Sequence, residues 1–169
     1  MRGEAQRKKR GFGTFVSPDE AFGNRVALPD IIGRWRRQMP SVLIEVRRHY
    51  SQEQEVAIME AVHAALREAF KIPAGDRNVR LIVHEPHRFA CPPAREKPEA
   101  YTHISIDAFA GRSLDAKRNL YRSIVTNLEP LGIPKDHVKI LLRELPRDNW
   151  GIRGGQAATD VELGFKVDV

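Results

Sequence analysis

The chain has 169 residues, of which 41% are hydrophobic and 30% charged, a composition typical of one soluble globular domain. Its formal charge of +6 is uneven: residues 1–39 carry nine Lys/Arg against four Asp/Glu, and residues 40–169 carry nineteen against eighteen. The near-neutral second part disfavours nucleic-acid binding as the main function. No apolar run approaches the roughly 18 residues of a membrane span, and the single cysteine, Cys91, fits a reducing cytoplasm.

Residues 1–39 show no periodicity and are punctuated by glycine and proline around a basic cluster at residues 7–10. They contain no continuous apolar segment, which excludes a secretory signal. We therefore expect a disordered or loosely attached basic leader over residues 1–39, and a folded domain over residues 40–169.

The folded pattern begins at Pro40, where residues 41–46 have the β-branched character of a strand. Ser51 and Gln54 form a capping-box pattern that starts a helix. This helix has an apolar stripe at helical spacing, made of Val56, Met59, Val62, Leu66 and Phe70. After it, residues 79–84 (VRLIVH) predict the second strand.

The same order of elements then recurs. Residues 102–109 alternate as a strand, Ser113 caps a helix that runs to about Leu128, and residues 138–142 predict a fourth strand. The two capping serines are 62 residues apart. Residues 161–169 alternate again and are interpreted as an edge strand at a subunit contact.

The domain is therefore expected to be an α/β (α+β) fold of two tandem βαβ units, with each crossover right-handed and its two strands parallel. We assign residues 40–100 to the first repeat, 101–145 to the second and 146–169 to a C-terminal tail. Two helices on one face of a four-stranded sheet leave the other face uncovered, which predicts an oligomer.

Several motifs in this order resemble the tautomerase superfamily. They are Met39-Pro40 before a strand, Ala110-Gly111-Arg112-Ser113 before the second helix, and the tail Asp148–Ala157 (DNWGIRGGQA). The long tandem members that resemble malonate semialdehyde decarboxylase are similar over residues 40–169, including His63, Ile72-Pro73 and Asp76-Arg77. The resemblance implies a homotrimer that needs no cofactor and uses an N-terminal proline as general base or acid.

For this sequence the resemblance implies that Pro40 is catalytic. A free prolyl nitrogen is a secondary amine that accepts a proton, and an apolar site or a nearby arginine lowers its pKa towards the operating pH. Within the 169-residue chain this nitrogen is an amide after Met39, which is not basic. Either translation starts at Met39 and the methionine is removed, which the abrupt onset of pattern favours, or the leader is cleaved. The alternative is that Pro40 only begins a strand.

Two arginines are candidates for holding a carboxylate. Arg112 occupies the position of the family's Gly-Arg-Ser arginine, and bidentate hydrogen bonds would hold the substrate acid there. The other interpretation is a solvated arginine just before a helix cap. Arg80 resembles the strand arginine of 4-oxalocrotonate tautomerase and could grip a second carboxylate or a carbonyl oxygen, but it is equally an exposed position on an alternating strand.

Four further candidates follow from the resemblance. Asp76 matches an acid that activates water in the decarboxylase, and it also suits a turn after Gly75. His63 matches a family histidine that would bind substrate, although a hydrogen-bonded core histidine is the simpler interpretation. Trp150 would pack over the mouth of the site or at a trimer contact, although a plain packing role is the simpler interpretation. The positions at which related decarboxylases and dehalogenases carry a second arginine are Ala110 and Phe109, so Phe109 would make the pocket more apolar.

His84, His87 and Cys91 do not complete a metal-ligand arrangement, and no metal is expected. The expected activity is isomerisation between the enol and keto forms of a small 2-oxo or 2-hydroxydienoate carboxylic acid, with no membrane or nucleic-acid partner. The alternatives are hydration, decarboxylation or dehalogenation on the same fold with Asp76 activating water, and a non-enzymatic oligomeric binding protein that retains the leader.

Overall fold

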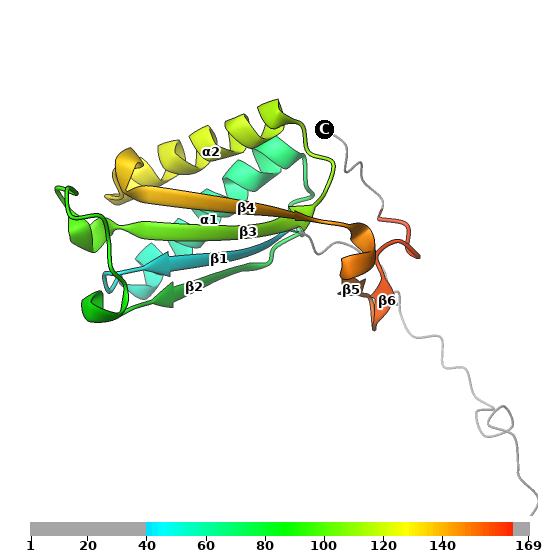
Figure 1. The fold of residues 1–169 in the computed structure, drawn as a ribbon, viewed down its shortest axis with the longest axis horizontal. Helices are drawn as coiled ribbons and strands as arrows, with labels where there is room; N and C mark the ends of the chain where they lie inside the picture. The colour runs from blue at the N-terminus through cyan, green and yellow to red at the C-terminus, as the bar shows by residue number, and fades with distance from the viewer. Residues whose placement is uncertain (1–39, 164–169) are drawn as a thin grey trace, which may run out of the picture. The chain divides into compact units, whose positions relative to one another are not determined.

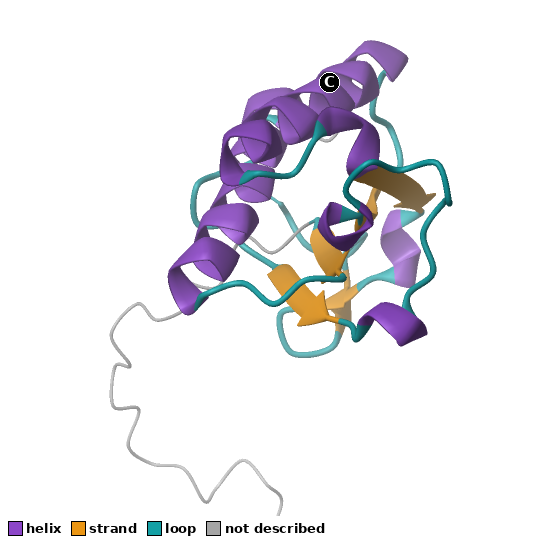
Figure 2. Cartoon of the chain, turned by 90° about the vertical axis from the view of Figure 1, so that its left-hand side faces the viewer, coloured by secondary structure: helices purple, strands orange, loops and turns teal. Residues whose placement is uncertain are grey.

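The computed structural model describes residues 40–163, so the expected leader and residues 164–169 lie outside the described part. Four strands form one mixed sheet in the order β2-β1-β3-β4, and both long helices lie on the same side of it (Figures 1 and 2). The main elements are β1 (Ser41–Val46), α1 (Gln52–Phe70), β2 (Val79–Val83), β3 (Thr102–Phe109), α2 (Leu114–Leu128) and β4 (Val138–Leu145).

Short elements connect and follow these. A two-stranded hairpin of β5 (Gly151–Ile152) and β6 (Gln156–Ala157) follows β4. The 3-10 turns are η3 (Pro86–Arg88), η4 (Pro98–Ala100), η5 (Glu129–Leu131), η6 (Lys135–His137) and η7 (Arg147–Asn149).

The strand pairing confirms the two tandem βαβ units. β1 runs parallel to β2 and β3 runs parallel to β4, while β1 and β3 pair antiparallel at the centre of the sheet. Each crossover contains one long helix, and α1 and α2 pack against each other in a single layer. The predicted fold class is therefore correct.

Local sequence explains where the helices begin. Ser51 accepts a hydrogen bond from the backbone of Gln54, and the Gln54 side chain accepts one from the backbone of Ser51, which is a complete capping box. Ser113 accepts from the backbone of Ala116 at 3.1 Å and caps α2.

Within residues 40–163 no helix combines the length and apolarity needed to cross a membrane.

Alternation along the strands separates two faces of the sheet. On the central strands, Val42, Ile44, Ile104 and Ile106 are fully buried against the helices. The helices contribute a matching apolar face that closes this core. Its fully buried helical members are Ile58, Val62, Ala65, Phe70, Leu120, Ile124 and Leu128.

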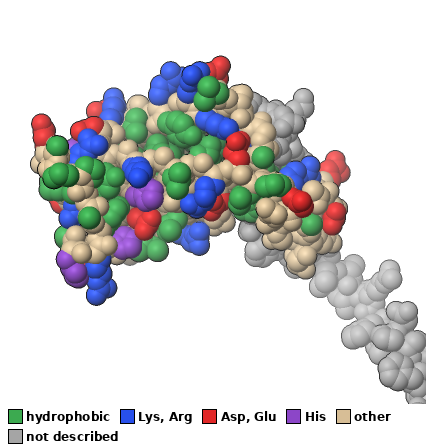
Figure 3. Space-filling model, in the orientation of Figure 1, with side chains coloured by type: hydrophobic (Ala, Val, Ile, Leu, Met, Phe, Trp, Pro, Cys, Tyr) green, Lys and Arg blue, Asp and Glu red, His purple; other side chains and the backbone are tan. Residues whose placement is uncertain are grey.

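The other face of the sheet carries no helix in residues 40–163. Ile82 and Leu141 point to this face and remain 46% and 43% exposed. Figure 3 shows hydrophobic side chains mixed with basic, acidic and histidine side chains across it. We call this surface, formed by the outward positions of β1 to β4, the uncovered face.

Two expectations about strands differ from the structure. β4 continues to Leu145, three residues beyond the predicted end, because it stays in register with β3 as far as the pair Phe109 and Leu145. On this extension Arg143 Nε donates to Asp107 Oδ1 at 2.6 Å. Residues 161–163, at the start of the expected edge strand, are not a strand.

Candidate active site

The sheet topology brings several predicted site residues to one end of the sheet. β1 starts where β3 ends, because Ser41 pairs with Asp107 in antiparallel register, and β4 ends beside β3 at Leu145. We call this end, where Pro40 precedes β1 and Phe109 closes β3, the proline edge. The β5–β6 hairpin follows β4 at this same end (Figure 1).

Pro40 is buried one residue before β1. The strand that follows is fixed on both sides: Val42 N–H donates to the carbonyl oxygen of Asn78 at 2.9 Å, and Ser41 is in register with Asp107. These contacts with the neighbouring chain segments fix the start of β1, and they therefore also restrict the position of the Pro40 nitrogen.

Arg112 lies three residues after β3 and only 6% of it is exposed. Its Nη1 donates to the carbonyl oxygen of Phe70 at 3.0 Å, and its guanidinium carbon is 4.6 Å from the centre of the Phe70 ring. Phe70 is the last residue of α1, where helix carbonyls lack partners and favour a cation. Arg112 is therefore not the solvated arginine of the simpler interpretation.

Asp76 and His63 are in contact at the loop that leads into β2. Asp76 is 1% exposed and its backbone N–H donates to the carbonyl oxygen of Pro73 at 3.0 Å, which closes a turn. His63 Nε2 lies 3.0 Å from the carbonyl oxygen of Asp76 and donates to it. His63 is thus a hydrogen-bonded core histidine that fixes the backbone of Asp76.

Arg80 is exposed on the uncovered face, and its Nη2 donates to Ser41 Oγ at 3.3 Å. It therefore lies next to the residue that follows Pro40. Arg112 contacts Phe70 of α1 on the helix side, so the sheet separates the two arginines.

Phe109 and Trp150 pack together at the proline edge, with ring centres 5.4 Å apart in an edge-to-face arrangement. Phe109 is 1% exposed, and Trp150 Nε1 is buried without a hydrogen-bond partner among residues 40–163. These rings join β3 to the tail as an apolar cluster separate from the main core. Its other members are Ile152, Ala158, Val161 and Leu163.

Glu144 is a site neighbour that the sequence analysis missed. Its Oε1 accepts from the backbone N–H of Arg112 at 3.2 Å, and its Oε2 accepts from Lys117 Nζ at 2.6 Å. Burial by itself raises the pKa of Glu144, but the hydrogen bond from Lys117, the backbone donors of Arg112 and Gly111, and the nearby positive charge together lower it. The clue in the sequence is that Glu144 is an acid on the helix side of an alternating strand.

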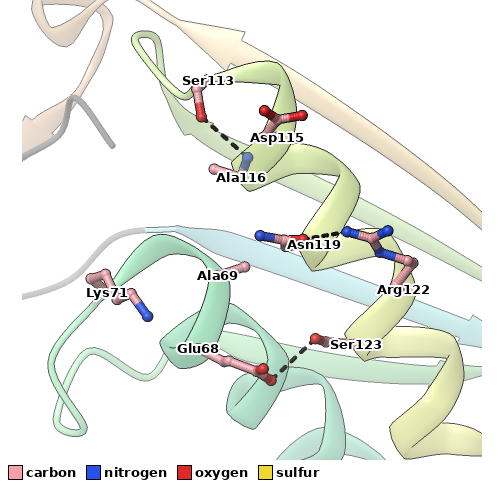
Figure 4. A pocket seen from close by; sticks show the side chains of 9 residues that line it. All are labelled: Glu68, Ala69, Lys71, Ser113, Asp115, Ala116, Asn119, Arg122 and Ser123. Atoms are coloured by element: carbon pink, nitrogen blue, oxygen red, sulfur yellow. Dashed lines mark hydrogen bonds between the residues drawn. The ribbon is translucent and has the colours of Figure 1, made fainter.

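A polar groove lies on the helix layer, between the end of α1 and the first half of α2 (Figure 4). None of the predicted site residues lines it. Glu68 and Ser123 bridge it with a 3.1 Å hydrogen bond. The lining consists of Glu68, Ala69, Lys71, Ser113, Asp115, Ala116, Asn119, Arg122 and Ser123.

His84, His87 and Cys91 have separate partners. His84 Nε2 is 2.9 Å from Glu45 Oε1, and His87 Nε2 accepts from Arg88 Nε at 3.3 Å. Arg47 Nη1 donates to Cys91 Sγ at 2.6 Å. Within residues 40–163 no three His, Cys, Asp or Glu side chains group in a way that could hold a metal ion.

Comparisons with known proteins point to one family. A family model described as "Tautomerase enzyme" matches residues 76–153. The chain is 31% identical over 52 residues to Probable tautomerase RSp0893 of Ralstonia nicotianae, a stretch that covers 30% of this chain and 74% of that protein.

Solved structures show the same fold. FG41 malonate semialdehyde decarboxylase inhibited by 3-bromopropiolate superposes with a TM-score of 0.64 at 30% identity, covering 69% of this chain and 92% of that one. A fused 4-OT, solved as an asymmetric trimer, superposes with a TM-score of 0.64 at 16% identity over 71% and 97%. The identity of 31% to the Ralstonia tautomerase and of 30% to FG41 malonate semialdehyde decarboxylase shows that the chain belongs to the tautomerase superfamily.

Proposed function

We propose that the chain is a cofactor-independent isomerase that interconverts the enol and keto forms of a small 2-oxo or 2-hydroxydienoate carboxylic acid. The observation that carries the proposal is that Pro40 and Arg112 are both buried at the proline edge. A base and a carboxylate anchor on one rigid frame are the two groups that this reaction needs.

In the proposed reaction, the free amine of Pro40 takes the proton from the enol hydroxyl. The electron pair moves through the conjugated system, and Pro40 returns the proton to carbon to give the keto acid. The substrate's own carbonyl accommodates the charge, so no cofactor participates. Burial disfavours the prolinium cation and lowers the pKa of the amine, which keeps a fraction of it basic at neutral pH.

Arg112 would bind the substrate carboxylate. Its burial strengthens an ion pair relative to the same pair in water, and its planar head suits a two-point contact with an acid. The bond to the Phe70 carbonyl and the contact with the Phe70 ring restrict the head to one orientation before substrate arrives.

The active form would begin at Pro40, because the acyl bond to Met39 removes the basicity of its nitrogen. Either initiation at Met39 followed by removal of the methionine, or cleavage of residues 1–39, would expose the amine. The proposed functional domain is therefore residues 40–169.

The uncovered face would be an interface between copies of the chain, as a trimer. Ile82 and Leu141 are large hydrophobic side chains that stay exposed on this face, and fused 4-OT, which shares the fold, forms trimers. Arg80 lies on the same face, so a neighbouring copy could present it or another side chain to the site.

The second candidate is decarboxylation or hydration of a small acid, with Asp76 activating water. The observation that favours it is the 30% identity to a malonate semialdehyde decarboxylase, together with the buried position of Asp76. Against it, Ala110 and Phe109 occupy the positions at which such enzymes and the related dehalogenases carry a second arginine. A non-enzymatic oligomeric binding protein, in which the leader is retained, is the third candidate.

Variants of residues 40–169 with a free Pro40 distinguish these candidates. Pro40→Ala should lower the rate of phenylenolpyruvate ketonisation by about 100-fold or more, whereas Pro93→Ala, in an exposed loop, should not. Asp76→Asn should leave tautomerisation largely intact. If wild type decarboxylates or hydrates a small acid and Asp76→Asn does not, that difference would identify the second candidate. A Pro40→Ala variant with unchanged activity would exclude the proline mechanism.

A further inference from the structure

Glu144 lies at the second-last position of β4, on the helix side of the sheet, where its carboxylate reaches the loop between β3 and α2. It accepts the backbone N–H of Arg112 at 3.2 Å and also the backbone N–H of Gly111. A single side chain thus binds two successive amides directly before α2.

Gly111 explains why this loop needs a restraint. Its φ is 120°, a conformation that glycine adopts freely and other residues do not. Glycine also allows the chain to leave that conformation easily, which would move Arg112. The hydrogen bonds from Gly111 and Arg112 to one carboxylate oppose that rotation.

Lys117 completes the arrangement from α2. Its Nζ donates to Glu144 Oε2 at 2.6 Å, and the two side chains are 22% and 26% exposed. The ammonium keeps Glu144 ionised, and an ionised carboxylate accepts backbone hydrogen bonds more strongly than a neutral one. The first turn of α2 and the end of β4 are thereby tied to the same loop.

Arg112 is therefore held at both ends by different groups. Glu144 fixes its backbone, while the carbonyl oxygen and ring of Phe70 fix its guanidinium. An anchor that must meet a carboxylate within a fraction of an ångström benefits from both restraints.

We propose that Glu144, with Lys117, is a positioning residue that sets the placement of Arg112 for binding the substrate carboxylate. This proposal rests on the proposed function, because it assumes that Arg112 binds the acid. It assigns Glu144 no contact with substrate and no proton transfer.

The test uses residues 40–169 with a free Pro40 and compares wild type with Glu144→Gln, Glu144→Ala and Lys117→Met. The matched control is Glu129→Gln, which alters another Glu–Lys pair, with Lys135 at 3.0 Å, that is 54% and 53% exposed. KM and kcat for phenylenolpyruvate and the Kd for phenylpyruvate are measured. Circular dichroism confirms that each variant is folded.

We expect Glu144→Ala to raise KM and Kd by about tenfold, with a smaller effect on kcat. Glu144→Gln keeps a side-chain oxygen for the backbone donors and should be partly rescued, and Glu129→Gln should resemble wild type. In an Arg112→Ala background, Glu144→Gln and Glu144→Ala should have no further effect, because the residue they position is gone. If Glu144→Ala does not fold, the Gln and Met variants carry the same comparison.

An equal loss of affinity on replacing Glu144 in the presence and absence of Arg112 would overturn the proposal, as would unchanged KM and Kd in all three variants. Failure of the proposed function gives a different result. In that case wild type does not turn over phenylenolpyruvate, and the Kd comparison still reports whether Glu144 acts through Arg112.

Discussion

The ring of Phe70 lies 4.6 Å from the guanidinium carbon of Arg112, and the carbonyl oxygen of Phe70 accepts a 3.0 Å hydrogen bond from Arg112 Nη1. The two residues are 42 positions apart, at the end of α1 and before the start of α2. One residue thus supports the arginine through its backbone and its side chain, and it couples the end of one repeat to the start of the other.

Replacing Phe70 with leucine keeps the carbonyl acceptor and removes the aromatic face. A buried cation–π contact contributes about 0.5–2 kcal/mol, so the KM for phenylenolpyruvate should rise by a few-fold to about 30-fold. Phe89→Leu is the matched control, because Phe89 packs against His84 and Tyr101 at the other end of the sheet. Its KM should not change, and an equal KM rise in both variants would argue against a specific role of the Phe70 ring.

The capping box of α1 should contribute measurably to stability. Ser51→Ala removes the acceptor for the Gln54 backbone N–H and should cost about 1 kcal/mol in the free energy of unfolding. Ser123→Ala, in the middle of α2, removes a hydroxyl that donates to the exposed Glu68 carboxylate at 3.1 Å and should change the free energy of unfolding by less than about 0.5 kcal/mol. Urea unfolding at one protein concentration measures both, and equal effects would contradict the assigned role of the cap.

The Glu144–Lys117 pair should make the free energy of unfolding depend on pH in the acid range. The folded state lowers the pKa of Glu144 below its ordinary value of 4.5, so the carboxylate stabilises the fold at pH values above 4.5. This contribution disappears as the pH falls through the lowered pKa. Wild type should therefore exceed Glu144→Gln in unfolding free energy near pH 7, and the difference should shrink as the pH falls below 4.5.

The control for that series is Glu129→Gln, which should differ from wild type by less than about 1 kcal/mol throughout because its ion pair is exposed. A difference between wild type and Glu144→Gln that stays constant as the pH falls below 4.5 would show that the carboxylate charge is not the stabilising element.

A charge on the uncovered face should weaken self-association. Leu141 on β4 and Val56 on α1 are each 43% exposed, so Leu141→Glu and Val56→Glu place the same charge in equally exposed positions on opposite sides of the molecule. Burying an unpaired carboxylate in an interface is unfavourable by several kcal/mol. Light scattering should show smaller species for Leu141→Glu only. A full-size oligomer in that variant would mean that copies associate through another surface.

The elements with strong local signals were predictable. The strand at residues 102–109 and the two serine caps match the structure, because alternation and capping are encoded within a few residues. The β5–β6 hairpin was not predicted, since its strands are two residues each and depend on packing against Phe109. The extension of β4 depends in the same way on its register with β3.

The candidate site likewise has parts that the sequence predicts and parts that it does not. The placement of Pro40 and Arg112 at one end of the sheet follows from the antiparallel pairing of β1 with β3, which two βαβ units by themselves do not specify. The partners of Arg112 do not follow, because Phe70 and Glu144 are 42 and 32 residues away and meet it only through tertiary packing. Sequence alternation could have placed Glu144 on the helix side, but not against the backbone of Gly111.

The central claim is that the nitrogen of Pro40 performs the chemistry, so it must be free. The most direct test compares phenylenolpyruvate ketonisation by residues 40–169 with a free Pro40, and by residues 1–169 with an intact Met1, each confirmed by mass spectrometry. We predict turnover by the first and a rate at least about 100-fold lower for the second. Equal rates from the two proteins, with no cleavage of the longer one, would contradict the proline mechanism.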